Sequence, residues 1–193
     1  MSSLPLTGSQ TVGPFFSLGL LYPAAQRNVL ANPQTAGERI RVEGRVLDGA
    51  GVPVPDAMVE IWQANAHGRY NHPADQSEAP LDPDFTGSGR SGTDEEGRYW
   101  FDTIKPGRVA FNDQIKQAPH LTVTIFARGL LNHLVTRVYF VDEPSNVEDV
   151  TLQCVPEARR ATLLAHRETR EGVTVYRFDI VLQGVNETAF FNV

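Results

Sequence analysis

Short stretches in which polar and apolar residues alternate, each bounded by turn-forming residues, recur along the chain from residue 39 onward. The clearest is Arg39–Leu47, whose period of two is typical of a strand with one buried face. A turn follows directly at Asp48-Gly49-Ala50-Gly51. Further strands are predicted over residues 57–63, 98–104, 121–127, 134–141 and 174–183. Several short strands separated by turns predict a mainly β protein, built as an antiparallel β-sandwich.

The two remaining parts of the chain are a single short helix and an N-terminal arm. The helix is predicted over residues 156–166, because Pro156 suits a first helical position and Ala, Leu and Arg follow. Residues 1–38 are predicted to form an irregular arm, because spaced prolines remove backbone donors and fix φ. Since the arm also carries Phe15, Phe16 and Leu18, we expect it to pack on the domain or on a partner. The β-sandwich domain is then predicted to span residues 39–193.

Size and charge exclude several classes of protein. A chain of 193 residues fits one domain with an adequate core. Its net charge of −6 makes it a poor general binder of nucleic acid. No basic region followed by an apolar run opens the chain, and no stretch approaches the roughly 20 apolar residues of a membrane helix. The single cysteine, Cys154, cannot form an internal disulfide. We therefore expect a cytoplasmic protein with neither nucleic-acid nor membrane partners.

Blocks of sequence resemble one enzyme family in both order and spacing. They include Trp62-Gln63-Ala64-Asn65, Gly68-Arg69-Tyr70-Asn71-His72-Pro73, Thr93-Asp94-Glu95-Glu96-Gly97, Ala118-Pro119-His120-Leu121-Thr122 and Tyr176-Arg177-Phe178-Asp179-Ile180. Together they resemble the intradiol ring-cleavage dioxygenases, and the resemblance covers nearly the whole chain. A single block would be weak support, whereas several in register are strong.

The resemblance implies a non-haem ferric ion held by two tyrosines and two histidines. Phenolate oxygens suit a hard ferric cation, and imidazoles suit iron generally. Tyr70 and His120 match the first tyrosine and the first histidine. The second tyrosine should follow residues 105–107, where the chain reads Arg108-Val109-Ala110-Phe111, and the second histidine falls on Thr122. We therefore expect neither a metal site nor a catalytic residue in this chain.

Such an incomplete ligand set resembles the α subunit of the two-chain members of the family. The resemblance implies that a related β subunit holds Fe(III) and that the chains assemble into a larger αβ oligomer. It also implies cleavage of 3,4-dihydroxybenzoate by O₂ to 3-carboxy-cis,cis-muconate, in the β-ketoadipate route of aromatic degradation. This chain would supply one wall of the substrate pocket at the α–β interface.

Four residues are expected to bind the substrate because they match pocket segments of the family. Arg128 would face the ring carboxylate, for which a guanidinium is well suited. Thr11 offers a hydroxyl, the backbone at Gly13 can approach a ligand closely, and Pro14 belongs to the same segment at the mouth of the pocket. The simpler interpretations are a surface cation at Arg128 and ordinary turn residues in the arm.

Two other functions stay open from the sequence. The chain could be a self-sufficient intradiol dioxygenase with altered ligands, in which Tyr70 and His120 would still serve. It could instead be a non-enzymatic β-sandwich that acts as a scaffold, in which both residues are ordinary buried side chains.

Overall fold

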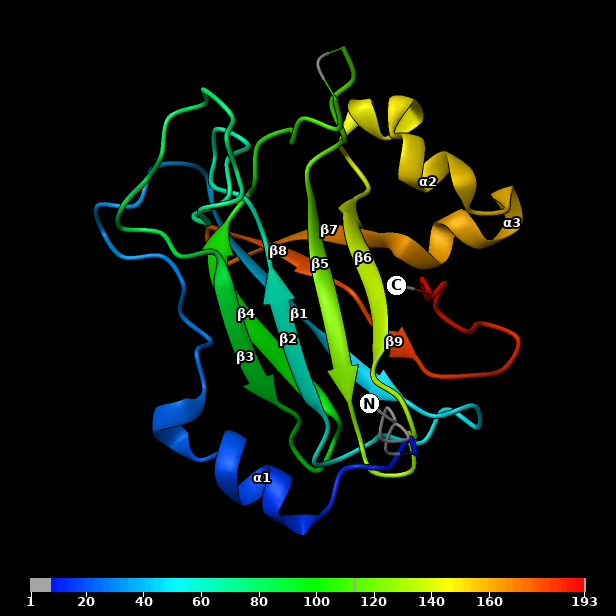
Figure 1. Ribbon diagram of the computed structural model, residues 1–193. Helices are drawn as coiled ribbons and strands as arrows, with labels where there is room; N and C mark the ends of the chain where they lie inside the picture. Colours follow the sequence, from blue (N-terminus) through cyan, green and yellow to red (C-terminus); the bar gives the residue numbers. More distant parts are fainter. Residues whose placement is uncertain (1–7, 113, 193) are drawn as a thin grey trace, which may run out of the picture.

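The computed structural model describes residues 8–112 and 114–192 (Figure 1). Within them, nine strands pair in the order β3-β2-β5-β6-β7-β8-β1-β4, with β9 beside β1. Their bounds are β1 Arg39–Leu47, β2 Met58–Trp62, β3 Ser88–Gly92, β4 Arg98–Ile104, β5 His120–Phe126, β6 Leu134–Phe140, β7 Leu164–Arg170, β8 Val173–Arg177 and β9 Ile180–Val181.

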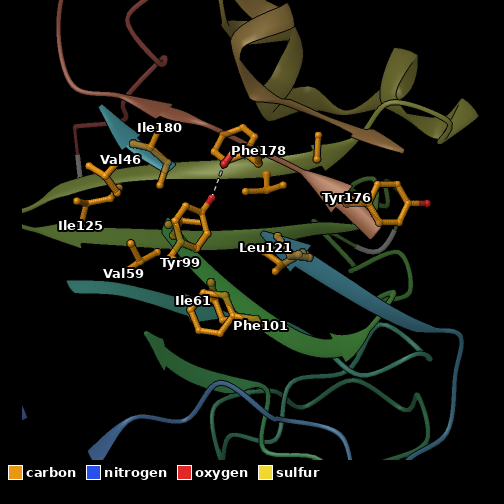
Figure 2. Close-up of a cluster of buried hydrophobic side chains, with 14 of the residues drawn as sticks. Val46, Val59, Ile61, Tyr99, Phe101, Leu121, Ile125, Tyr176, Phe178 and Ile180 are labelled. Carbon is orange, nitrogen blue, oxygen red and sulfur yellow. Dashed lines mark hydrogen bonds between the residues drawn. The ribbon is translucent and has the colours of Figure 1, made fainter. Parts of the chain in front are cut away.

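The strands form two layers around one core. β3, β2, β5 and β6 make one layer, β8, β1 and β4 make the other, and β7 connects them by pairing with both β6 and β8. Alternate side chains of each layer point inward, so that Val59, Ile61 and Leu121 pack in the same buried cluster as Tyr99 and Phe101 (Figure 2). The mainly β, sandwich-like fold is confirmed. The β1–β8, β1–β9 and β6–β7 pairs are parallel, so the sheet is not purely antiparallel.

The six predicted strands are all present, two of them with the predicted bounds (β1 and β4). The stretch predicted as one strand over 174–183 is divided into β8 and β9. Two strands escaped prediction, namely β3 and β7.

The helical prediction over residues 156–166 was too long. The helix α3 covers only Glu157–Arg160, the 3₁₀ turn η3 continues over Ala161–Leu163, and the chain then enters β7. Before it come the 3₁₀ helix η2 at Pro144–Glu148 and the helix α2 at Val150–Cys154, whose N-cap is Asp149. None of the helices in the described parts of the chain has the length and apolar character needed to cross a bilayer.

The arm is more regular than predicted. Helix α1 spans Pro14–Leu20, because proline is favoured at a first helical position, and the 3₁₀ helix η1 spans Pro23–Ala25. After these turns, Arg27 pairs with Arg90 of β3, and Val29 forms a bridge to Asp102 of β4. Residues 27–30 thus lie between the two edge strands and satisfy backbone groups of both. The division of the chain at residue 38 stays a prediction.

Candidate functional sites

Arg128 lies in the turn that follows β5. The turn is closed by a 3.2 Å hydrogen bond from Leu130 N to Ala127 O, and Gly129 adopts a φ of +90° that favours glycine. The Arg128 side chain is 69% exposed, and its Nη2 lies 3.9 Å from Oδ2 of Asp56. This guanidinium is held loosely and remains accessible to a ligand.

The predicted residues of the arm lie beside this turn. Oγ1 of Thr11 accepts a 2.7 Å hydrogen bond from the backbone N–H of Gly129. Gly13 is the extended N-cap of α1, and Pro14 is the first residue of that helix. Helix α1 is anchored nearby by Phe16, whose ring centroid lies 5.9 Å from that of Phe126 at the end of β5. The structure therefore brings the arm segment to the Arg128 turn, while the role of these residues toward a substrate stays a prediction.

Tyr70 and His120 belong to a different region, at the start of β5. With about 3.4 Å of rise per residue, the seven residues of β5 separate this region from Arg128 by roughly 20 Å. Thr122 pairs with Trp62 of β2 on one side and with Arg137 of β6 on the other, so these three side chains share the outer face of the layer. His120, two residues before Thr122, lies on the same face and is fully buried.

A large open cavity, of about 970 Å³, adjoins this face. Its walls come from Trp62, from the loop over residues 67–79 and from the segment around Arg108 and Gln117. The rings of Trp62 and Tyr70 stack at 5.6 Å with an interplanar angle of 12°, which makes one wall flat and aromatic. The segment in which the second tyrosine is missing, Arg108-Val109-Ala110-Phe111, also lines the cavity.

The charge that dominates this region is the Arg137 guanidinium. Burial raises the pKa of the Tyr70 phenol, and the nearby Arg137 charge opposes that rise. Burial and then Arg137 lower the pKa of His120 to about 4, so that its imidazole is neutral near pH 7. Nδ1 of His120 lies 2.8 Å from the carbonyl oxygen of Ala118, which fixes the ring. Tyr70 and His120 therefore both lie within the field of one positive charge.

The side chains present do not fit a ferric ion. Neither the segment Arg108-Val109-Ala110-Phe111 nor Thr122 offers an anionic or imidazole donor where the ligand set lacks one. The Arg137 cation beside Thr122 would repel a trivalent cation, and the protonated phenol favoured at Tyr70 is a poor ligand for one. Across residues 8–112 and 114–192, no three His, Cys, Asp or Glu side chains are grouped in a way that could hold a metal ion.

The low pKa of His120 makes stability depend on pH. Its folded-state pKa of about 4 is below the ordinary value of 6.5, so the unfolded chain binds the proton more readily between these values. We expect the full stability above pH 6.5 and a loss of roughly 3 kcal/mol as the pH falls to about 4. Urea unfolding of His120→Gln should show a shallower decline over this window, whereas exposed His166→Gln should keep the wild-type slope. Identical slopes in all three proteins would contradict the assignment.

Sequence reasoning missed three residues that shape these two regions: Arg137, Asp149 and Asp56. Arg137 is a single charged residue in a predicted strand, so from the sequence it resembles a solvated side chain. The strand register shows that it lies beside Thr122. Asp149 is fully buried and accepts hydrogen bonds from Ala118 N and the Tyr139 hydroxyl. The one local signal for Asp149 was its suitability as an N-cap.

Comparison with known proteins agrees with this architecture. The model of a family described as "Dioxygenase" matches residues 12–184, so the chain belongs to that dioxygenase family. The protocatechuate 3,4-dioxygenase alpha chain of Burkholderia cepacia is 43% identical over 204 residues, and the match covers 100% of both chains. The beta chain from the same organism is 42% identical over 190 residues, covering 95% of this chain and 78% of that one.

A solved structure supports the fold as well. The dioxygenase domain of a dioxygenase carbohydrate-binding protein fusion from Streptomyces sp. SirexAA-E superimposes with a TM-score of 0.64 and is 26% identical. The match covers 83% of this chain and 89% of that domain.

Proposed function

We propose that this chain is the α subunit of a protocatechuate 3,4-dioxygenase. The match to an α chain covers both proteins completely, whereas the match to a β chain leaves about a fifth of the β chain uncovered. In this proposal the enzyme cleaves 3,4-dihydroxybenzoate with O₂ to 3-carboxy-cis,cis-muconate. The partner β subunit holds the non-haem Fe(III), because the Tyr70 and His120 region of this chain lacks a fitting donor set.

One observation carries the role of this chain, namely the hydrogen bond from Gly129 N to Thr11 Oγ1. It fixes the arm segment that contains Gly13 and Pro14 against the turn of Arg128. Because Asp56 approaches Arg128 only to 3.9 Å, the guanidinium can rotate toward an incoming carboxylate. Arg128 would then bind the ring carboxylate, and the segment from Thr11 to Pro14 would border the mouth of the same pocket.

The surface around α1 supports contact with the β subunit. Phe15, Leu18 and Tyr22 are 82%, 70% and 51% exposed, and Phe15 and Leu18 stand three residues apart on one side of α1. A group of large, exposed apolar side chains is typical of a protein–protein interface. This surface is close to Thr11, so a β subunit docked on it would meet the Arg128 region. Higher αβ assembly and a cytoplasmic location belong to the same proposal.

The test replaces Arg128 with alanine in the reconstituted αβ complex. We expect weaker binding of 3,4-dihydroxybenzoate by roughly 1.5–3 kcal/mol, or about 10- to 150-fold, because a charge-assisted hydrogen bond to the carboxylate is lost. The measurements are the steady-state KM and the Kd from anaerobic titration. The iron content of the complex should not change.

A matched control is Arg98→Ala, which removes an arginine of similar exposure (64%) from β4. This variant should bind the substrate as the wild type does. Wild-type affinity in Arg128→Ala would refute the substrate role of Arg128. Iron-dependent ring cleavage by this chain without a β subunit would refute the division of labour between the chains.

A further inference from the structure

Arg137 carries a positive charge that is not neutralised by any carboxylate of the described residues. Its Nη1 donates to Oε1 of Gln117 at 2.6 Å and to the hydroxyl of Tyr139 at 3.3 Å, and both acceptors are neutral. The neighbouring Asp149 carboxylate is already engaged, with bonds from Ala118 N, Leu152 N and the Tyr139 hydroxyl. A half-buried guanidinium without an anion is costly, so an anionic ligand would be stabilised here.

The remaining nitrogens of Arg137 are available to such a ligand. Within residues 8–112 and 114–192, Nε and Nη2 of Arg137 have no protein hydrogen-bond partner, and neither is a fully buried atom. Gln117, which Arg137 contacts, lines the cavity of about 970 Å³, as do Tyr70 and Trp62. The cross-strand register also places Arg137 one strand away from Thr122, which itself pairs with Trp62. Arg137 is not itself a lining residue, so its guanidinium stands beside the cavity, directly behind the lining residue Gln117.

Other polar groups of the cavity agree with an anionic occupant. Arg108 and Lys116 line it, and Nε of Arg108 is buried without a partner in the described chain. Of the acidic residues in the lining, Asp75 already accepts hydrogen bonds from Tyr70 N and Ser77 N, and Glu78 is exposed at the rim. The lining cations Arg108 and Lys116 are matched by Asp75 and Glu78, and Arg108 also pairs with Glu148, so the unpaired charge beside the cavity is that of Arg137.

We propose that this cavity is a metal-free binding site for a small aromatic carboxylate. Its ring would lie against the flat wall of Trp62 and Tyr70, and its carboxylate would accept hydrogen bonds from Arg137. Because the surrounding residues offer no set of metal ligands, the positive charge that binds the carboxylate would come from the Arg137 guanidinium and not from a metal ion. This site does not depend on the proposed role of Arg128, because Arg128 follows the end of β5, whereas Arg137 lies on β6 beside Thr122, near the start of β5.

The test uses the fluorescence of Trp62 in the full chain. The protein has two tryptophans, and replacing Trp100 with phenylalanine leaves Trp62 as the sole reporter. Benzoate is titrated at neutral pH, and its uncharged analogue benzamide is titrated in parallel. We expect saturable quenching by benzoate, binding of benzamide that is weaker by about 10- to 100-fold, and weakening of benzoate binding at high salt.

Variants locate the site on Arg137. In Arg137→Gln the affinity for benzoate should fall to that for benzamide, and Arg137→Lys should recover part of it. Arg167→Gln on β7, an arginine paired with Asp142, should bind benzoate as the parent does. Equal binding of benzoate and benzamide by the Trp100→Phe parent would overturn the proposal, and this comparison needs no substitution at Arg137. Absence of saturable quenching by benzoate would overturn it as well.

Discussion

Replacing Gly44 with alanine is expected to lower the free energy of unfolding by more than about 4 kcal/mol. Gly44 lies in the middle of β1, opposite Tyr99 of β4, and the carbonyl oxygen of Phe178 occupies the space that a β-carbon would need. The same oxygen accepts a 2.6 Å hydrogen bond from the buried Tyr99 hydroxyl. An alanine would push this carbonyl away and leave the hydroxyl without its acceptor, so overpacking and an unsatisfied polar group act together.

Urea unfolding of the isolated chain measures this effect, with Gly19→Ala as the control. Gly19 is also a glycine within a regular element, but no heavy atom lies within 4 Å of its added β-carbon. In α1 the alanine should be neutral or stabilise by up to about 1 kcal/mol. Similar stabilities for the two variants would show that the carbonyl of Phe178 can move freely.

Removing the Asp149 carboxylate is expected to cost about 4 kcal/mol of stability. Asp149 is completely buried, and its two oxygens accept hydrogen bonds from Ala118 N, Leu152 N and the Tyr139 hydroxyl. Asp149→Ala loses an N-cap, worth about 1 kcal/mol, and leaves two further buried donors unsatisfied at about 1–3 kcal/mol each. Because Ala118 and Tyr139 flank His120 and Arg137, the variant should also loosen the cavity region.

Thermal and urea unfolding, read by circular dichroism, give the magnitude. Glu148→Ala is the matched control, because Glu148 is an exposed neighbour that pairs with Arg108 at 3.2 Å and should contribute less than about 1 kcal/mol. Asp149→Asn keeps one side-chain acceptor and should fall between the two. A loss below about 1 kcal/mol in Asp149→Ala would mean that water replaces the carboxylate.

The strands that could be predicted are those whose pattern reflects one buried and one solvated face. β1 has this alternation along its whole length and β4 has it from Arg98 to Thr103, and the bounds of both strands were predicted without error. β3 has the sequence Ser-Gly-Arg-Ser-Gly, in which Gly89 is required because Ile61, Leu30 and Phe101 crowd its position. Because its two inward residues are Gly89 and Ser91, β3 shows no hydrophobic period. The start of β7 was predicted to be helical from its local propensity. It forms a strand because pairing with β6 and β8 outweighs that propensity.

The sequence identified individual residues of the candidate sites, but not the contacts between distant segments that form these sites. Thr11 and Arg128 were both singled out from the sequence, but only the fold shows that the arm contacts the turn over a separation of 118 residues. Tyr70 and His120 were recognised as the remains of a ligand set. Arg137 was not, because its importance comes from the register between β5 and β6, and periodicity within one strand contains no information on register.

The pairing of residues 27–30 with β3 and β4 has a consequence for the order of events during synthesis. Asn28 donates hydrogen bonds to Ser91 Oγ and Trp100 O, which lie 63 and 72 residues later in the chain. During synthesis, residues 27–30 therefore leave the ribosome before β3 and β4, the two strands with which they pair. They can pair only after both strands have formed. Until then the facing edges of β3 and β4 have unpaired backbone groups that could pair with another chain. Pairing with residues 27–30 is therefore the folding step that protects these edges from misassociation.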